Sequence, residues 1–350
     1  MYNSTNLIKN LVAIPAPAGE EAAVANYVTE AMNSMGYTPH IDAKGNVYTT
    51  IGDPKRELPH VLITAHMDEI ALMVVDIEDD GKIRVAALGG TYAWKWGEGA
   101  VSLMTAAGLV VGILSFGCIH TNHENSVVQY ARSNPLTWEK AYVFTGKSAD
   151  ELAKLGIRPG TRVVLAPERR VVTEFGEHIA SYFLDDRADV AVLLMALEAL
   201  KNSDLSDHIT LTFAATASEE VGADGAKYLL TCQPADICVA LEIAPKTPEA
   251  DFPIDATPTI WARDGYAAME AKDGYLLEEC CAELGITPRF QYLSRGGSDA
   301  SCAAAIGLTA RPVTLGLPVE NSHGYEIMHR DAPAELLRLL LAYLNRLASV

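Results

Sequence analysis

Basic residues are scarce in this sequence. Lys and Arg together number 27 against 45 Asp and Glu, which gives a formal net charge of −18 at pH 7. Nucleic-acid phosphates and anionic membrane surfaces repel so acidic a chain, so we expect neither as a partner. The charge also fits a plain role in solubility, and carboxylates gathered around a metal ion would add to it.

Long apolar runs are missing as well. No segment approaches the roughly 18–20 consecutive apolar residues that a membrane-spanning helix needs. Residues 1–21 contain Glu20 and Glu21 and have no apolar stretch of the kind found in a secretory signal. We therefore expect a protein that stays in the cytoplasm.

Cysteine is present, but in no pattern typical of a metal site or a disulfide scaffold. None of the six Cys residues forms a Cys-x-x-Cys motif, and Cys280 and Cys281 are adjacent within an apolar helical pattern. We interpret all six as reduced, buried thiols of a cytosolic protein rather than as nucleophiles or ligands.

The apolar patterns predict two domains, since 350 residues exceed one typical domain. Strand–helix alternation predicts a three-layer α/β/α domain built from residues 1–69 and 166–350. Short β-like runs in residues 70–165 predict an inserted, mainly β domain, with a capping box, Ser148 and Glu151, opening a helix over 148–156. The other expected helices are 4–13, 19–35, 187–200, 222–230, 274–284, 298–306 and 333–348, and the expected α/β strands are 61–65, 209–213, 236–241 and 312–317.

Histidines and acids stand next to the ends of several expected elements. Ligands of α/β sheets gather outside the carboxyl ends of the strands, so these side chains are expected to converge. Two His and several carboxylates form a ligand set suited to zinc, cobalt or manganese rather than to calcium or an iron–sulfur cluster. The five segments contain His66 and Asp68, Asp185 and Asp186, Glu219 and Glu220, Glu242, and His323.

A pair of metal ions needs a shared carboxylate and further ligands on each ion. Asp185 can supply the bridge, while His66 with one acid completes one ion and His323 with another acid completes the second. One carboxylate must stay off the metals to accept a proton from water. Neighbouring side chains point in different directions, so we assign Glu219 as the general base and Glu220 as a ligand.

Each of these motifs alone has an ordinary structural explanation. A single His or an acidic pair usually lies on the surface, and the metal hypothesis rests on all five segments falling at element ends in one domain. His120 and His123, in the inserted domain, have as alternatives a minor metal site or a contribution to a neighbouring subunit's active site. We interpret the remaining histidines as structural: His40, His60, His178, His208 and His329.

The order of these motifs resembles the tetrahedral (TET) dodecameric aminopeptidases, the glutamyl-aminopeptidase-like metallopeptidase family forty-two. The likeness runs nearly from end to end of the chain. The segment LAKLGIRPGTRVV resembles the exit from the family's inserted domain. The other matching segments are AHMDEIALMV, LDDRADVAVLLMALEAL, ATASEEVGADGA, GGSDASCAAAIG and LPVENSHGYEIM.

The resemblance implies roles for individual residues. It makes His66, Asp185, Glu220 and His323 metal ligands, with Asp185 as the bridge, and Glu219 the general base; Asp68 orients His66 through a hydrogen bond. Two positions depart from the family pattern. Glu242 stands where the family commonly has Asp as a ligand, and His323 lies in E-N-S-H-G rather than R-Y-x-H-S, which leaves the substrate contacts there undefined.

The expected function is that of an aminopeptidase with two divalent metal ions per chain, zinc or else cobalt or manganese. A hydroxide held between the ions attacks the amino-terminal peptide bond of a short peptide, and Glu219 accepts and returns its proton. The alternatives are a deacylase or carboxypeptidase on the same site and a glycosidase, although aromatic residues are few, at 7%. The resemblance also implies a homo-oligomer, a dodecamer built from dimers through residues 70–165, with its active sites in an interior chamber.

Overall fold

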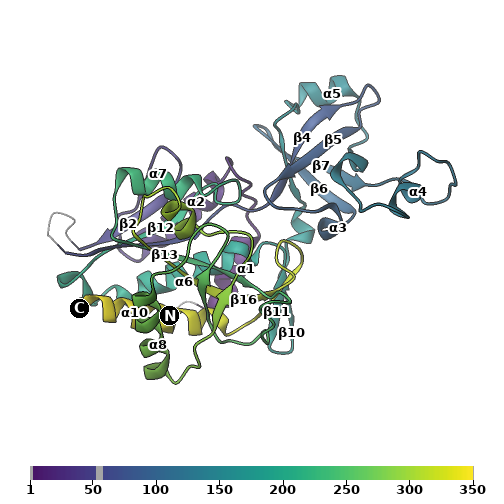
Figure 1. Cartoon of the computed structure of the whole chain (residues 1–350). Coiled ribbons are helices and arrows are strands. Elements are labelled where there is room, and N and C mark those ends of the chain that lie inside the picture. The colour runs from purple at the N-terminus through teal and green to yellow at the C-terminus, as the bar shows by residue number, and fades with distance from the viewer. Residues whose placement is uncertain (1–2, 53–57, 350) are drawn as a thin grey trace.

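The protein consists of an α/β unit and a smaller β-barrel that stands to one side of it (Figure 1). The computed structural model describes residues 3–52 and 58–349. Among these residues, no helix combines the length and the apolar character needed to cross a membrane. The three-layer α/β/α fold with an inserted β unit, expected from the alternation pattern, is confirmed by this architecture.

The α/β unit is organised around one mixed sheet with the order β1-β2-β12-β3-β13-β16-β17-β11-β10. Four neighbouring strands at its centre are parallel, β12 (Thr210–Thr216), β3 (His60–His66), β13 (Ile237–Pro245) and β16 (Arg311–Glu320). Their carboxyl ends therefore meet at one edge of the sheet. The outer strands are β1 (His40–Ile41), β2 (Val47–Ile51), β10 (Thr173–Phe175), β11 (His178–Ser181), β14 (Thr259–Arg263), β15 (Phe290–Tyr292) and β17 (Glu326–His329).

Helices cover both faces of this sheet because its central strands are apolar on both sides. On β3, Ile63 belongs to one core cluster and Leu62 to another on the opposite face. This confirms the strand predicted over residues 61–65 and shows that both of its faces are buried, as in other central strands of α/β sheets. One face packs against α1 (Ser4–Val12), α2 (Ala22–Ser34), α6 (Leu184–Leu200), α8 (Ala271–Leu284) and α10 (Ala332–Ala348), and the other against α7 (Asp224–Cys232) and α9 (Asp299–Ala304).

The barrel closes through the strand order β4-β5-β8-β7-β6-β9 around its own apolar core. The predicted capping box is present at α5 (Ala149–Lys154), where Ser148 and Glu151 exchange hydrogen bonds. The sequence did not indicate that the β-like runs close on themselves, nor the short helices α3 (Ala93–Trp96) and α4 (Val127–Ala131). The strands are β4 (Ala71–Ile77), β5 (Ile83–Leu88), β6 (Gly99–Thr105), β7 (Gly108–Ser115), β8 (Tyr142–Phe144) and β9 (Arg162–Leu165).

The cysteine prediction needs one correction. All six thiols are free, as expected, and Cys280 and Cys281 are buried on α8. However, Cys118 and Cys232 are exposed, so the expectation of six buried thiols is wrong for these two. Cys118 lies in the segment that joins β7 to α4, and Cys232 is the last residue of α7. The local apolar pattern did not distinguish these two cysteines from the four buried ones.

Candidate metal centre

The sheet brings the five acid and histidine segments together at the carboxyl edge of its parallel strands. His66 is the last residue of β3, and the segment of Glu219 and Glu220 follows the neighbouring β12. Glu242 lies within β13, on the other side of β3. The turn after β16 carries His323. Asp185 sits at the start of α6, where its backbone is not yet helical.

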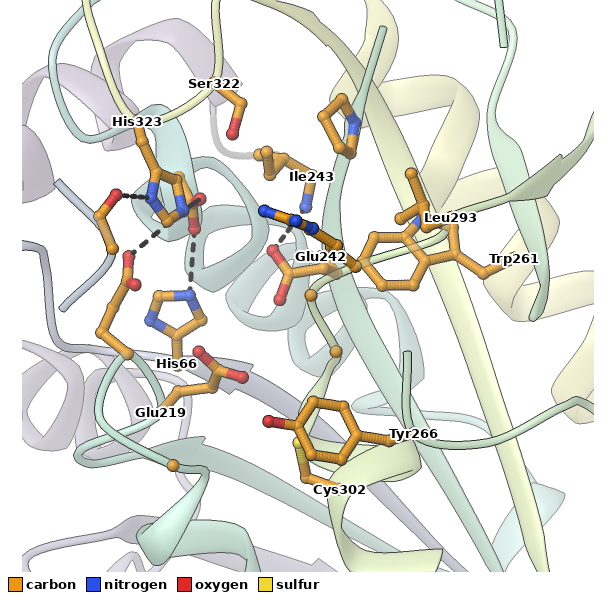
Figure 2. A pocket seen from close by; sticks show the side chains of 18 of the residues that line it. His66, Glu219, Glu242, Ile243, Trp261, Tyr266, Leu293, Cys302, Ser322 and His323 are labelled. Atoms are coloured by element: carbon orange, nitrogen blue, oxygen red, sulfur yellow. Dashed lines mark hydrogen bonds and ion pairs between the residues drawn. The ribbon is translucent and has the colours of Figure 1, made fainter. Parts of the chain in front are cut away.

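Asp185 lies between the two histidines, as a shared ligand would. One carboxylate oxygen, Oδ1, is 3.0 Å from His66 Nε2, and the other, Oδ2, is 3.3 Å from His323 Nε2. Figure 2 shows the two rings on the same side of the cavity, with Glu219 next to His66. Each histidine therefore presents a ring nitrogen toward a different oxygen of one buried carboxylate.

The ligand-type atoms form two groups that share Asp185. The first contains His66, Asp185, Asp186 and Glu242, and the second contains Asp185, Glu220 and His323, with all atoms of a group within 4.8 Å of one another. Glu219 belongs to neither group. The two neighbouring glutamates thus differ: Glu220 belongs to a ligand group with Asp185 and His323, whereas Glu219 lines the cavity outside both groups.

The donor set of both groups fits a divalent transition-metal ion. Each group combines a histidine nitrogen with carboxylate oxygens, which is the mixture that zinc, cobalt and manganese accept. Asp186 uses Oδ2 to accept the backbone N–H of His66 at 2.8 Å. Its Oδ1 is buried without a hydrogen-bond partner among the described residues, so one ligand-type oxygen in the first group is unassigned.

Backbone hydrogen bonds to carboxylates fix the turns that carry these side chains. Asp68 accepts the N–H of Glu219 through Oδ1 at 2.8 Å and that of Glu220 through Oδ2 at 3.1 Å. Toward His66 Nδ1, the carbonyl oxygen of Asp68 lies at 3.2 Å and Oδ1 at 3.5 Å. The carboxylate of Asp68 therefore shapes the Glu219–Glu220 turn as well as facing the imidazole that it was expected to orient.

Glu326 has the same function on the opposite side of the site. Its Oε1 accepts the N–H of His323 at 2.9 Å, and its Oε2 accepts the N–H of Asp185 at 3.0 Å. The imidazole of His323 donates from Nδ1 to the carbonyl oxygen of Gly90 at 2.6 Å. This bond leaves Nε2 as the free ligand atom.

Burial raises the pKa of most acids in the site. It is the main cause of the raised pKa of Glu219 and of Glu242, and it raises the pKa of Glu220 to about 7. Burial alone would lower the pKa of His66, but the charge of Asp186 and hydrogen bonds to other carboxylates outweigh it and raise that pKa. A divalent cation among these groups would favour the ionised acids and the neutral imidazoles.

The groups open into a cavity of about 480 Å³. Trp261, Leu293 and Tyr266 line the side opposite the histidines in Figure 2, and Arg295 also lines the cavity. The barrel unit contributes Tyr92, Trp94 and Lys95 to the rim. Such a cavity can hold a few peptide residues, with a polar reacting centre at one end.

The seven residues that the sequence analysis assigned as ligands, general base or orienting acid all lie in or next to this centre. The structure brings together His66, Asp185, Glu220, Glu242 and His323 in the two groups, with Glu219 and Asp68 beside them. Neither group includes His120 or His123, both exposed in the barrel unit. Sequence reasoning assigned no role to Asp186 or Glu326, although both stand in the family-like segments LDDRADV and ENSHGYE.

A three-layer α/β/α fold with a histidine–carboxylate centre at the carboxyl edge of its sheet is typical of metal-dependent hydrolases. The chain belongs to the M42 glutamyl aminopeptidase family, whose model matches residues 45–339. It is thus a metallo-aminopeptidase, an enzyme that hydrolyses peptide bonds.

This chain is similar to individual proteins over most of its own length and of theirs. The chain is 26% identical to a glutamyl aminopeptidase of Lactococcus lactis over 325 residues, 91% of this chain and 89% of that protein. An aminopeptidase from the archaeon Desulfurococcus kamchatkensis superposes with a TM-score of 0.85 at 28% identity, covering 98% of this chain and 94% of that one. The TET1 peptidase of Pyrococcus horikoshii, which can assemble into a tetrahedron or a large octahedral shell, shares the fold with a TM-score of 0.83 at 24% identity, covering 97% and 98%.

Proposed function

We propose that this protein is a two-metal aminopeptidase that removes the amino-terminal residue of short peptides, with Glu219 as the general base. One observation carries the proposal: Asp185 lies between His66 and His323, while Glu219 reaches the cavity outside both ligand groups. That division separates the residues that would hold metal ions from the residue that would move protons.

The residues present would hold two ions, one through His66, Asp185 and Glu242 and one through Asp185, Glu220 and His323. Bound there, divalent ions would polarise the peptide carbonyl and lower the pKa of a water molecule toward about 7. Zinc is the proposed metal, with cobalt or manganese as alternatives.

The position of Glu219 supports a role in moving the proton in both halves of the reaction. Its side chain points into the cavity, and the bond from its backbone N–H to Asp68 fixes the turn that carries it. The carboxylate takes a proton from the attacking water and gives it to the leaving amine, so one group serves as base and then as acid.

The acids at the same end of the cavity suit a positively charged substrate terminus. Glu219, Glu220 and Glu242 all line the cavity there, and a free α-ammonium can donate to such carboxylates. The substrate would then lie with its first side chain toward the wall of Trp261 and Leu293. This orientation explains why cleavage would occur at the amino-terminal bond.

Acetylation of the substrate terminus tests this proposal. The acetyl group removes the charge of the amine, so at least one charge-assisted contact is lost, worth about 1.5–3 kcal/mol. We expect kcat/KM for an acetylated peptide to be roughly ten- to hundredfold lower than for the same peptide with a free terminus. A folded protein with an ordered amino terminus is the control and should remain uncut. Equal cleavage of both peptides would contradict the aminopeptidase mechanism and favour a deacylase or an endopeptidase.

We further propose that residues 70–165 form a domain that assembles the chain into a homo-oligomer, a dodecamer built from dimers. Strand β7 supports this role because alternate residues of a strand share one face. Its outward residues Leu109, Val111 and Ile113 are 47%, 65% and 47% exposed, and Phe144, next to Ile113 on β8, is 54% exposed. An apolar strip of this kind is typical of a surface that another protein covers.

A charge in this strip should interrupt the assembly. We expect light scattering to find an oligomer for the unchanged protein and a smaller species for Val111→Glu, because a buried unpaired carboxylate costs several kcal/mol. Ile41→Glu is the matched control, since Ile41 is 53% exposed on the α/β unit. A stable monomer at micromolar concentration, or an oligomer that Val111→Glu leaves unchanged, would argue against this assignment.

A further inference from the structure

The barrel unit reaches the metal centre through the loop that follows β5. Residues 89–96, between β5 and β6, include α3 and contribute Gly90, Tyr92, Trp94 and Lys95 to the cavity. This 89–96 loop approaches the ligand side chains closely. A Cβ placed on Gly89 would lie 3.5 Å from Glu220 Oε2, and one on Gly90 would lie 3.1 Å from two atoms of the His323 ring.

The loop is tied to the turn that carries His323. We name residues 321–324, which join β16 to β17, the His323 turn. Lys95 Nζ donates to Asn321 Oδ1 at 2.6 Å and to the carbonyl oxygen of Ser322 at 2.9 Å. The carbonyl oxygen of Gly90 accepts from His323 Nδ1. Both ends of the loop therefore contact the His323 turn. Lys95 binds the side chain of Asn321 and the main chain of Ser322, and Gly90 binds the imidazole of His323.

The His323 turn has a backbone that needs such support. Asn321 and His323 have φ values of 65° and 58°, in the left-handed region that side chains other than glycine adopt at a cost. Within the turn, Asn321 Nδ2 donates to the carbonyl oxygen of Tyr325 at 2.9 Å. Glu326 and the 89–96 loop also hold the turn.

Lys95 also packs tightly along its stem. A Cβ placed on Gly324 would lie 2.8 Å from Lys95 Cδ, so the glycine leaves just enough room for the lysine chain. Both oxygens that accept from Lys95 Nζ are uncharged, so the contact is specific hydrogen bonding rather than a surface ion pair. Figure 2 shows Ser322 and His323 side by side at the edge of the cavity, where this contact holds the backbone.

We propose that Lys95 is a positioning residue for His323, so that the barrel unit takes part in building the metal centre of its own chain. Lys95 holds the main chain of the His323 turn, and the carbonyl of Gly90 sets the direction of the ring. Together they aim Nε2 at the group formed by Asp185 and Glu220. This inference rests on the proposed two-metal function, and it concerns only the ion that His323 would hold.

Lys95→Met tests the proposal because it removes the three ammonium donors and keeps an unbranched stem. The metal-free protein is titrated with Co²⁺, whose absorption spectrum reports each ion bound, and with Zn²⁺ against a coloured chelator. We expect one of the two equivalents to bind about tenfold more weakly, since loss of a group that orients a ligand costs ten- to hundredfold in affinity. The other equivalent, on the side of His66, should bind as in the unchanged protein.

Two further variants make the result specific. Lys154→Met removes an exposed lysine of the same barrel unit, on α5, and should change neither equivalent. Gly90→Ala brings a methyl group against the His323 ring without altering Lys95, and it should weaken the same equivalent as Lys95→Met. It also keeps the proposal testable if Lys95→Met does not fold.

Three results would overturn the proposal. Unchanged affinities in Lys95→Met and Gly90→Ala would show that the loop does not position His323. An equal loss at both equivalents, or a lower melting temperature of the metal-free protein with intact affinities, would identify Lys95 as a general structural contact. If the unchanged protein binds fewer than two ions, the two-metal function itself fails, and that outcome is recognised before any variant is made.

Discussion

Glu219→Gln should retain both metal ions and lose about 10²–10⁴-fold in kcat, because it removes the proton acceptor but no ligand. Glutamine has the shape of glutamate and still allows the backbone N–H to bond to Asp68. Metal content, measured by atomic absorption after gel filtration, should therefore stay at the level of the unchanged protein. Only the step that transfers the proton is removed.

Glu220→Gln is a matched control for this prediction. It makes the same chemical change one residue later, but in a side chain that lies with Asp185 and His323. We expect this variant to lose metal occupancy together with activity. His323→Ala should behave in the same way. If Glu219→Gln loses metal and Glu220→Gln keeps it, the two glutamates have been assigned the wrong way round.

The residues that could be predicted from the sequence are those whose surroundings are local. VLITA is a short apolar run, so it identifies a central strand and places His66 at its carboxyl end. The Glu219–Glu220 pair follows a second run of this kind, and the parallel pairing of the two strands brings the groups together. Side chains at the carboxyl ends of parallel strands converge because the sheet geometry is regular. The order of apolar runs in the sequence was therefore enough to predict that these residues meet.

Contacts between loops that are distant in sequence could not be predicted from such patterns. Lys95 meets the His323 turn across 227 positions of the chain, and no periodicity connects the two segments. The closure of the barrel depends on strand pairings that short β-like runs do not specify. Glu326 is close to His323 in sequence, but it is the first residue of the short strand β17. The pairing of this strand with β11, which the sequence did not predict, brings its carboxylate to the backbone N–H of Asp185.

A buried ionic cluster lies at the junction of the two units, and we expect mutations in it to lower the free energy of unfolding strongly. Glu69 follows β3, and Arg170 lies just beyond the exit from the barrel. Two nitrogens of Arg170 each donate to a different carboxylate oxygen of Glu69 at 2.7 Å, and Arg187 of α6 donates to Oε2 at the same distance. The three side chains are fully buried, so this cluster connects both segments that join the two units to α6, the helix that carries Asp185.

The two guanidinium groups also hold the end of α1. Arg170 donates from Nε to the carbonyl oxygen of Val12 at 2.9 Å and from a terminal nitrogen to that of Ile14 at 3.0 Å. These bonds cannot be replaced by water without opening the core. The carboxylate of Glu69 is thus the central acceptor of a network in which two cations would otherwise lie close together without a counter-charge.

Glu69→Gln should therefore lower the free energy of unfolding by about 3–5 kcal/mol, the usual cost of breaking a buried ion pair by neutralising one partner. Glu335→Gln is the control, because it neutralises a half-exposed carboxylate paired with Arg338 and should cost about 1 kcal/mol or less. Both values are to be measured by urea denaturation at one protomer concentration, since assembly makes apparent stability depend on concentration. A loss at Glu69 no larger than at Glu335 would mean that the arginines find other partners, and that packing rather than charge holds the junction.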